Sequence, residues 1–335
     1  MKLCRILLTM LVCAAISVAQ AQTDTQFTNY WAVPAYYNPA TAGSTEWLRI
    51  NAAGRLQWAG IENAPKGFVI TADSPLPVAA GKLGAGINLQ RETIGLFINL
   101  AVNAQVAYRL KAGPGMLGIG FSAGYFNQQF RGSEVVLPDD GGGNGSDDTG
   151  ADGGGSGDST FPQQDVAGSA VDLGAGLWYS TKSFYAGAAC MHLLQPRIRL
   201  ELKGTEGSAA SLYESQIGRM AYFTAGGNIR LGKSLIKVQP SVLALTDFNI
   251  FSCAATLRAS YNDFLSAGVG YRWKDAVSLM LGAQYKGFSI GYSYDIPVSA
   301  IAKASSGSHE IALGYRFRLD FSPKSKYKQR SIRIM

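Results

Sequence analysis

Apolar and polar residues alternate with a period of two along several long stretches of this chain. In residues 98–109, INLAVNAQVAYR, every second residue is apolar and the residues between are polar or small. The stretches 265–273, 288–296 and 308–319 follow the same rule. Because successive side chains of a β-strand point to opposite faces, each stretch is predicted to be a strand with one apolar face and one polar or small-residue face.

The alternation predicts about fourteen strands, most of them about ten residues long or longer, which is the length that a tilted membrane-spanning strand needs. An even number of strands is usual for a single-chain bacterial barrel. The predicted strands are 47–58, 66–76, 82–91, 98–110, 115–127, 168–180, 183–192, 217–231, 234–246, 249–260, 264–273, 276–286, 287–296 and 308–319.

A soluble β-sandwich would also show this alternation, so the connections provide a separate test. If both ends of the barrel chain lie on one side, every second connection falls on that side. The short turns at 111–115, 180–183, 232–234 and 286–287 do so, and the long connections 128–167, 193–216 and 297–307 fall on the other side. Only 16% of the residues are charged, against about 25% in soluble domains. We therefore predict an all-β protein, a transmembrane antiparallel β-barrel.

The start of the chain predicts export. Lys2 and Arg5 precede an apolar run over 6–19, and Ala19-Gln20-Ala21 fits the small-x-small site of a signal peptidase. Residues 1–21 are therefore predicted to be a signal peptide, and losing its two basic residues lowers the formal charge from +7 to +5. We expect the mature protein in the outer membrane, with both termini in the periplasm.

The mature chain divides into three parts. Residues 22–46 are predicted to be a periplasmic segment or a plug, 47–321 the barrel, and 322–335 a basic periplasmic tail. This tail is either solvated or a docking segment for an acidic partner. The connection over 137–160 has six Asp, nine Gly and no Lys or Arg, which predicts a mobile external loop. Calcium binding by its carboxylates is the alternative.

Candidate catalytic and metal-ligating residues are few. The chain has two histidines, His192 and His309, and lacks a Gly-x-Ser-x-Gly elbow and a phosphate-binding Gly-rich loop that opens a helix. We therefore expect no catalytic residue, no metal and no cofactor. A hydrolase that uses Asp295 and His309 as neighbours across the last hairpin remains an alternative, beside a simple hydrogen-bonded pair in the lumen.

Charged and amide side chains on the predicted polar faces need partners, because they must avoid the lipid. We predict that they form a hydrogen-bonded network inside the barrel. Its predicted members are Arg55, Gln57, Asp73, Asp295, His309 and Glu310.

Three stretches together resemble one protein family. They are FTNYWAVPAYYNPATAGS from residue 27, RLQWAGIENAPKGFVITADSPL from residue 55, and SIGYSYDIPVSAIAKASSGSHEIALGYRF from residue 289. They resemble the PorP/SprF family of Bacteroidetes. The resemblance implies a non-enzymatic outer-membrane component of the type IX secretion and gliding machinery. It also implies periplasmic ring or peptidoglycan-anchoring proteins and an exported surface protein or adhesin as partners. Nucleic acid is not expected as a partner, because the protein is predicted to be exported.

The uncharged stretch before the first strand belongs to this family motif. Asn-Pro forces a turn and ends any preceding helix, and the small residues allow close approach of the backbone. We predict that 27–43 folds at or into the periplasmic mouth, with the two tyrosines packed on lumenal walls. An ordinary turn before a strand is the alternative. The motif residues are Tyr36, Tyr37, Asn38, Pro39, Ala40 and Gly43.

The same fold would suit a diffusion porin or a small-solute transporter, and this is the alternative function. A porin needs an open lumen, whereas a secretion component with a filled lumen would conduct poorly.

Overall fold

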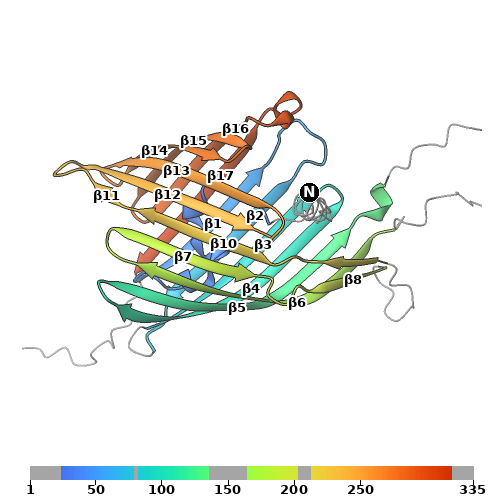
Figure 1. Ribbon diagram of the computed structural model, residues 1–335, viewed down its shortest axis with the longest axis horizontal. Coiled ribbons are helices and arrows are strands. Elements are labelled where there is room, and N and C mark those ends of the chain that lie inside the picture. Colours follow the sequence, from blue (N-terminus) through green and yellow to red (C-terminus); the bar gives the residue numbers. More distant parts are fainter. Residues whose placement is uncertain (1–23, 79–81, 136–163, 203–212, 319–335) are drawn as a thin grey trace, which may run out of the picture.

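The computed structural model describes residues 24–78, 82–135, 164–202 and 213–318. The predicted signal peptide, the 137–160 loop and the 322–335 tail lie outside the described residues. The described strands form one antiparallel sheet that closes on itself, because the last strand pairs with the first along its whole length. Figure 1 shows the resulting barrel, with its strands tilted against the barrel axis.

The described residues contain seventeen strands in this sheet. They are β1 (Trp47–Leu56), β2 (Lys66–Pro75), β3 (Leu83–Ile94), β4 (Phe97–Ala112), β5 (Gly115–Phe130), β6 (Val166–Ser180), β7 (Phe184–Met191), β8 (Arg197–Leu202), β9 (Tyr213–Gln216), β10 (Met220–Gly227), β11 (Ile229–Arg230), β12 (Ile236–Thr246), β13 (Phe251–Tyr261), β14 (Leu265–Arg272), β15 (Ala276–Tyr285), β16 (Phe288–Pro297) and β17 (Ser308–Arg318).

One predicted strand, 217–231, is interrupted in the structure, and the predicted connection 193–216 is partly strand, because it contains β8 and β9. β7 and β8 both pair with β6, so they are pieces of one strand of the wall. β9 and β10 pair with β8 and β7, and β10 and β11 both pair with β12, so β9, β10 and β11 are pieces of the next strand. The breaks have local causes. His192 and Gln195 have positive φ angles of 56° and 46°, which end the extended backbone after β7. Pro240 in β12 has no N–H for its neighbour, and pairing with β10 stops at Ser241. With these pieces joined, the barrel has fourteen strands, and the predicted fold is confirmed.

The two ends of the barrel differ in their connections. We call the end where β1 begins and β17 finishes the terminal end, and the opposite end the loop end. Five connections at the terminal end are turns of two to five residues, at 113–114, 181–183, 231–235, 262–264 and 286–287, and all except 262–264 were predicted. The connection between β5 and β6 begins and ends at the loop end, and the connection over 298–307 also lies there. The loop end has short turns as well, at 95–96, 247–250 and 273–275.

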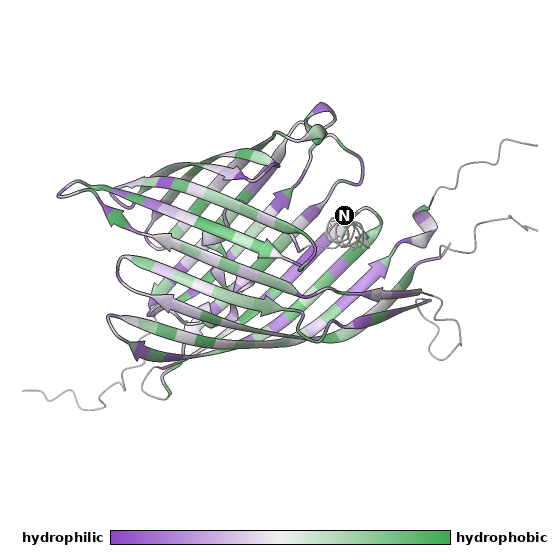
Figure 2. Ribbon diagram, viewed as in Figure 1, coloured by the Kyte–Doolittle hydropathy of each residue, from purple (hydrophilic) through white to green (hydrophobic). Residues whose placement is uncertain are grey.

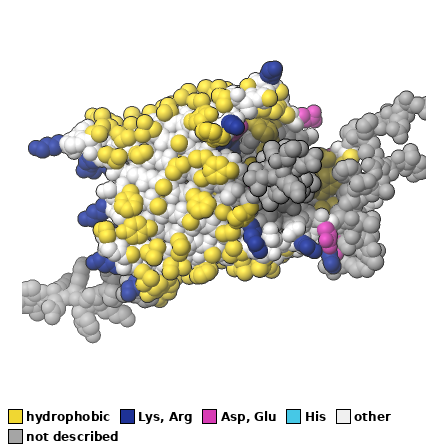
Figure 3. Space-filling model, viewed as in Figure 1, with side chains coloured by type: hydrophobic (Ala, Val, Ile, Leu, Met, Phe, Trp, Pro, Cys, Tyr) yellow, Lys and Arg dark blue, Asp and Glu magenta, His cyan; other side chains and the backbone are white. Residues whose placement is uncertain are grey.

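The outer surface of the barrel is apolar. In β4, Leu100, Val102 and Val106 are between 37% and 46% exposed, whereas Asn103 and Gln105 on the opposite face are at most 5% exposed. Figures 2 and 3 show that this alternation continues over neighbouring strands and that hydrophobic side chains spread over the outer surface. Such a continuous exposed apolar surface far exceeds the patches on soluble monomers, and it suits contact with lipid.

No helix among the described residues is long and apolar enough to cross a membrane. The helices are single turns: η1 (Tyr30–Ala32), α2 (Pro34–Tyr37) and η2 (Pro39–Thr41) before the barrel, and η4 (Gly132–Glu134) and η5 (Ala300–Lys303) at the loop end.

The main hydrophobic cluster lies inside the barrel. It joins apolar residues of 27–37 to inward-facing residues of the wall. A second cluster, near the loop end, fills the space between β4, β5, β6 and β8 and includes Phe126, Phe130 and Ile198.

Candidate functional site in the barrel lumen

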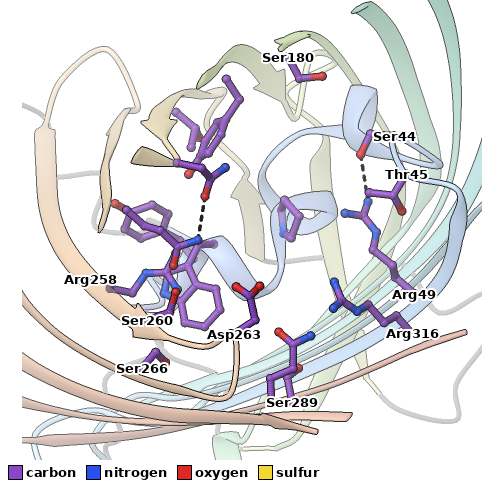
Figure 4. Close-up of a pocket in the computed structure, with 18 of the residues that line it drawn as sticks. Ser44, Thr45, Arg49, Ser180, Arg258, Ser260, Asp263, Ser266, Ser289 and Arg316 are labelled. Carbon is purple, nitrogen blue, oxygen red and sulfur yellow. Dashed lines mark hydrogen bonds between the residues drawn. The ribbon is translucent and has the colours of Figure 1, made fainter. Parts of the chain in front are cut away.

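Residues 24–46 precede the first strand, and we call them the N-terminal segment. Their contacts run through the barrel, from wall residues near the loop end to wall residues at the terminal end. Figure 4 shows the segment in pale blue inside the ring of strands. Side chains of the N-terminal segment therefore contact the inner wall on several sides, which an ordinary turn before a strand would not do.

The segment is built from short turns because its sequence disfavours a longer helix. Pro34 starts α2 and Pro39 starts η2, since proline is tolerated in the first turn of a helix. Asn38 between them is extended, with φ −149° and ψ 111°, as a residue before proline prefers. Its side-chain Oδ1 accepts a hydrogen bond of 2.9 Å from the Ala40 amide and so caps η2.

The Asn-Pro-Ala turn lies directly against the wall. The other end of the Asn38 amide, Nδ2, donates to the backbone oxygen of Leu177 in β6 at 2.9 Å. A Cβ atom added to Gly120 of β5 would lie 2.2 Å from the Ala40 nitrogen, and one added to Gly84 would lie 2.2 Å from the Ala42 oxygen. Only glycine in the wall permits this approach. The sequence analysis placed the small residues on the segment; the structure shows that the wall contributes them as well.

The aromatic residues of the segment form a buried stack. Tyr36 and Tyr37 are 4% and 2% exposed, and their rings meet edge to face at a centroid distance of 4.6 Å. Tyr37 continues onto Tyr222 of β10 at 5.4 Å. The Tyr37 hydroxyl accepts a 2.8 Å hydrogen bond from the Phe27 amide, and the Tyr36 hydroxyl donates to the Thr25 carbonyl. Each buried hydroxyl therefore has a partner.

Four charged side chains from four strands meet near the loop end, and we call them the lumenal charge cluster. They are Arg55 of β1, Arg272 of β14, Asp295 of β16 and Glu310 of β17. Arg55 lies 2.6 Å from Asp295 and 3.3 Å from Glu310, and Arg272 lies 3.3 Å from Asp295. All four are at most 8% exposed. Arg272 also pairs with Asp275, in the connection after β14, at 2.9 Å. Every buried charge of the cluster therefore has a partner of opposite sign, as buried ions require.

This cluster holds the beginning of the segment. One Glu310 oxygen accepts from the Asn29 amide at 2.7 Å and from Asn29 Nδ2 at 2.9 Å; the other accepts from the Thr28 amide at 2.7 Å. The Thr28 hydroxyl donates to Asp295 at 2.8 Å. Hydrogen bonds to a charged group contribute about 1.5–3 kcal/mol each, so this is a strong anchor.

A second anchor lies at the terminal end. The Gly43 amide donates to Asp73 of β2 at 2.8 Å. Arg49 of β1 pairs with the same carboxylate at 2.8 Å and donates to the Thr41 carbonyl at 3.0 Å. Gly43 has a φ of +62°, which favours glycine. The segment is thus fixed at both ends by carboxylates of the wall.

A third anchor involves residues that the sequence analysis missed. His192 lies between two carboxylates, 2.9 Å from Asp172 and 3.3 Å from Asp24, and the Tyr222 hydroxyl donates to Asp24. Burial by itself would raise the pKa of Asp24, but the nearby His192 charge and the hydrogen bonds from His192 and Tyr222 hold that pKa below its ordinary value. No sequence motif links these residues, because 168 positions separate Asp24 from His192.

The structure brings together some of the predicted network residues and separates others. Arg55, Asp295 and Glu310 lie in the lumenal charge cluster, and Asp73 lies in the terminal-end anchor with Arg49. Gln57 follows β1 in a connection, where its backbone N–H donates to the Pro65 carbonyl. Within the described part of the chain, no hydrogen bond joins Gln57 to the cluster.

The prediction for His309 requires a correction. His309 faces outward: it pairs with Tyr294 in the β16–β17 ladder, and its ring hydrogen-bonds the Tyr292 hydroxyl at 2.8 Å. Asp295 pairs with Ser308 and faces inward. One residue along a strand changes the face, so Asp295 and His309 lie on opposite sides of the wall. The Asp–His pair that a lumenal hydrolase would need is therefore not assembled.

Comparison with known protein families gives a match over most of the chain. A profile described as type IX secretion system membrane protein PorP/SprF matches residues 19–315. A search of curated proteins finds no match to the chain.

Among solved structures, the chain is similar to a Pseudomonas aeruginosa FadL homologue, with 11% identity and a TM-score of 0.46 over 85% of this chain and 94% of that one. It is also similar to the CymD monoaromatic hydrocarbon channel, with 10% identity and a TM-score of 0.48 over 86% and 93%. The KdgM porin matches with 6% identity and a TM-score of 0.37 over 80% and 99%.

Proposed function

Because the chain belongs to the PorP/SprF family of type IX secretion system membrane proteins, we propose that it is a non-enzymatic outer-membrane component of this machinery whose barrel is closed by its own N-terminal segment. The observation that carries the proposal is the anchoring of that segment to opposite ends of the lumen. Carboxylates hold it at Thr28 and Asn29 near the loop end and at Gly43 at the terminal end.

A lumen filled in this way suits a scaffold for protein partners better than a pore. The segment buries Phe27, Tyr30, Tyr36 and Tyr37 against the wall, each at most 4% exposed. Opening a water-filled path would expose these side chains and break the hydrogen bonds to Asp295 and Glu310. A diffusion porin or small-solute transporter, the alternative function, would need that rearrangement.

The proposed orientation places the terminal end in the periplasm and the loop end outside the cell, with residues 1–21 removed on export. The short terminal-end turns support this, since periplasmic turns of bacterial barrels are short and external loops longer. In this orientation, the terminal end would meet periplasmic ring or peptidoglycan-anchoring proteins. The loop end would meet an exported surface protein with a sorting domain.

A deletion strain tests the function. Without this gene, sorting-domain proteins, or one adhesin among them, should stay in the periplasm, and gliding should be lost if that adhesin drives it. The measurement is surface labelling followed by mass spectrometry of the outer membrane and the periplasm. Normal export of every sorting-domain protein would refute the proposal.

Conductance separates the two candidate functions. The purified protein should give no stable open channel in a planar bilayer, whereas a variant that lacks residues 24–43 should conduct. Reproducible conductance by the complete mature chain, equal to that of the deletion variant, would favour the porin.

A further inference from the structure

A cavity of about 570 Å³ opens at the terminal end of the barrel, and we call it the mouth cavity. Its inner end is formed by the N-terminal segment, through Tyr30, Trp31, Pro34 and Tyr37. The barrel wall forms its sides (Figure 4). The plugged lumen therefore ends in a blind recess, which is far larger than one inorganic anion would fill.

Arginines line two sides of the mouth cavity. Figure 4 shows Arg258 of β13 on one side and Arg49 of β1 with Arg316 of β17 on the other. Hydroxyl side chains also line the cavity. The hydroxyl residues labelled in the figure are Ser44, Thr45, Ser180, Ser260, Ser266 and Ser289.

Arg258 is the unusual member of this lining. It is only 8% exposed, its guanidinium stacks 3.6 Å above the Trp31 ring, and its buried Nε has no hydrogen-bond partner. Among the described residues, no carboxylate pairs with it. An arginine stays charged in proteins, and a buried cation without an anion is costly. The ring face attracts the charge but accepts no hydrogen bond in the guanidinium plane. Arg258 thus lacks an acceptor at Nε and, among the described residues, a carboxylate to balance its charge.

The other charged residues of the cavity do not supply a carboxylate for Arg258. Arg49 is balanced by Asp73, and Asp263, an acid that lines the cavity, is balanced by Lys237 at 2.5 Å. Arg316 is exposed, 5.7 Å from the Trp47 ring, and has no ion pair within the described residues. The cavity therefore carries an excess positive charge.

The rim around the cavity is also basic. Figure 3 shows Lys and Arg side chains along the left-hand edge, where the β11–β12 turn lies. In the described residues, the exposed acids of the terminal-end turns and strand ends are Glu46 and Asp263. The exposed cations there are Lys82, Lys111, Lys182, Arg230, Lys233, Lys286 and Arg318. Such a field attracts an acidic partner and speeds its association.

We propose that the mouth cavity binds an acidic peptide segment of a partner protein, with carboxylates on Arg258 and Arg316. Apolar or aromatic side chains of the same peptide would pack on Trp31 and on Trp178, which stacks on Tyr185 at 5.0 Å. The arginines, aromatic rings and hydroxyls around one recess match a peptide better than a free anion. That the partner is periplasmic rests on the proposed function; the binding itself does not.

The test is direct binding to the purified, full-length mature protein in detergent. The probe is a fluorescein-labelled hexapeptide, Glu-Trp-Asp-Tyr-Glu-Asp, followed by fluorescence anisotropy. The matched peptide, Gln-Trp-Asn-Tyr-Gln-Asn, keeps the shape and removes the charge. We expect the acidic peptide to bind about tenfold or more tightly than the neutral one, since charge-assisted hydrogen bonds are the stronger kind.

Arg258→Gln and Arg316→Gln should each weaken binding of the acidic peptide about tenfold. Arg230→Gln removes an exposed charge at the same end, outside the cavity, and should change binding less than twofold. Because Arg258 is buried, heat-modifiable migration in gel electrophoresis checks that its variant still forms a barrel. Arg316 is exposed, so its variant remains a test if the other fails to fold.

Three results would overturn the proposal: equal binding of the two peptides, unchanged binding by Arg316→Gln, or displacement of the peptide by inorganic phosphate at equal concentration. The last would mean a simple anion site. None of them depends on export, so a failed deletion-strain experiment would refute the proposed function and leave this site standing.

Discussion

Replacing Glu310 by Gln should release the beginning of the N-terminal segment. In the structure, each oxygen of this carboxylate accepts a backbone amide, from Thr28 on one side and from Asn29 on the other, both at 2.7 Å. A glutamine amide has one acceptor oxygen and one donor NH₂. Whichever way it turns, one backbone N–H of the segment faces a donor.

The cost follows from this geometry. One charged hydrogen bond is lost, which accounts for about 1.5–3 kcal/mol, and a buried donor is left unpaired. Within the described residues, the change also leaves Asp295 as the one carboxylate paired with Arg55. We expect docking of the segment to weaken by about 3 kcal/mol, which is a factor of about one hundred in the docking equilibrium.

Amide hydrogen exchange with mass spectrometry measures this equilibrium. Peptides that cover residues 24–43 should exchange about one hundredfold faster in Glu310→Gln, because exchange follows the population of the open state. Glu62→Gln, an exposed acid in the β1–β2 connection, is the control and should exchange like the wild type. If Glu310→Gln leaves the protection of 24–43 unchanged while the barrel stays folded, the cluster does not hold the segment.

Three further predictions follow from other parts of the site. In Gly120→Ala the added Cβ would lie 2.2 Å from the Ala40 nitrogen, so amide exchange over 38–43 should become faster. In the control, Gly54→Ala, the nearest atom outside its chain neighbours belongs to the Phe68 ring at 3.7 Å, and exchange should not change. Equal exchange in the two variants would contradict the close approach. The lowered pKa of Asp24 means that its contribution to docking is complete above pH 3.8 and is lost as the pH falls below that value. Protection of the first residues of the segment, relative to the intrinsic exchange rate at each pH, should therefore fall in acid. The fall should be smaller in Asp24→Asn, and an identical pH profile would refute the role. Leu281→Arg on the outer face, where Leu281 is 66% exposed, should destabilise folding into lipid vesicles by about 2–4 kcal/mol, and a soluble, detergent-independent variant or wild type would overturn the membrane interpretation.

Much of the fold could be predicted because strand alternation is a local property. The stretch 98–109 shows its apolar face without any knowledge of its neighbours, and β4 has this face outward. Alternation does not distinguish lipid from a protein core, so the connection lengths were needed as well. The interruptions could not be predicted: the positive φ angles at His192 and Gln195 and the missed pairing at Pro240 depend on the contacts of the finished wall.

The site was predicted less completely than the fold. Arg55, Asp295 and Glu310 were found because charged residues on a lumenal face need partners. His309 was assigned to the lumen, although the alternation that placed Glu310 inward requires His309 to face outward. Asp24 and Asp172 were missed because they meet only through His192 in the folded barrel, and no recognisable sequence motif connects the three residues.

The sequence alone determined the class of this protein, the number and approximate limits of its strands, and the inward or outward direction of most side chains, because each follows from residues close together in the chain. Only the tertiary structure decided which inward-facing charges meet, how the N-terminal segment crosses the lumen, and where Arg258 is left without an acid. Those outcomes depend on barrel closure, which sets the register between strands far apart in sequence. Distances across the lumen are therefore properties of the closed barrel, and no local pattern records them.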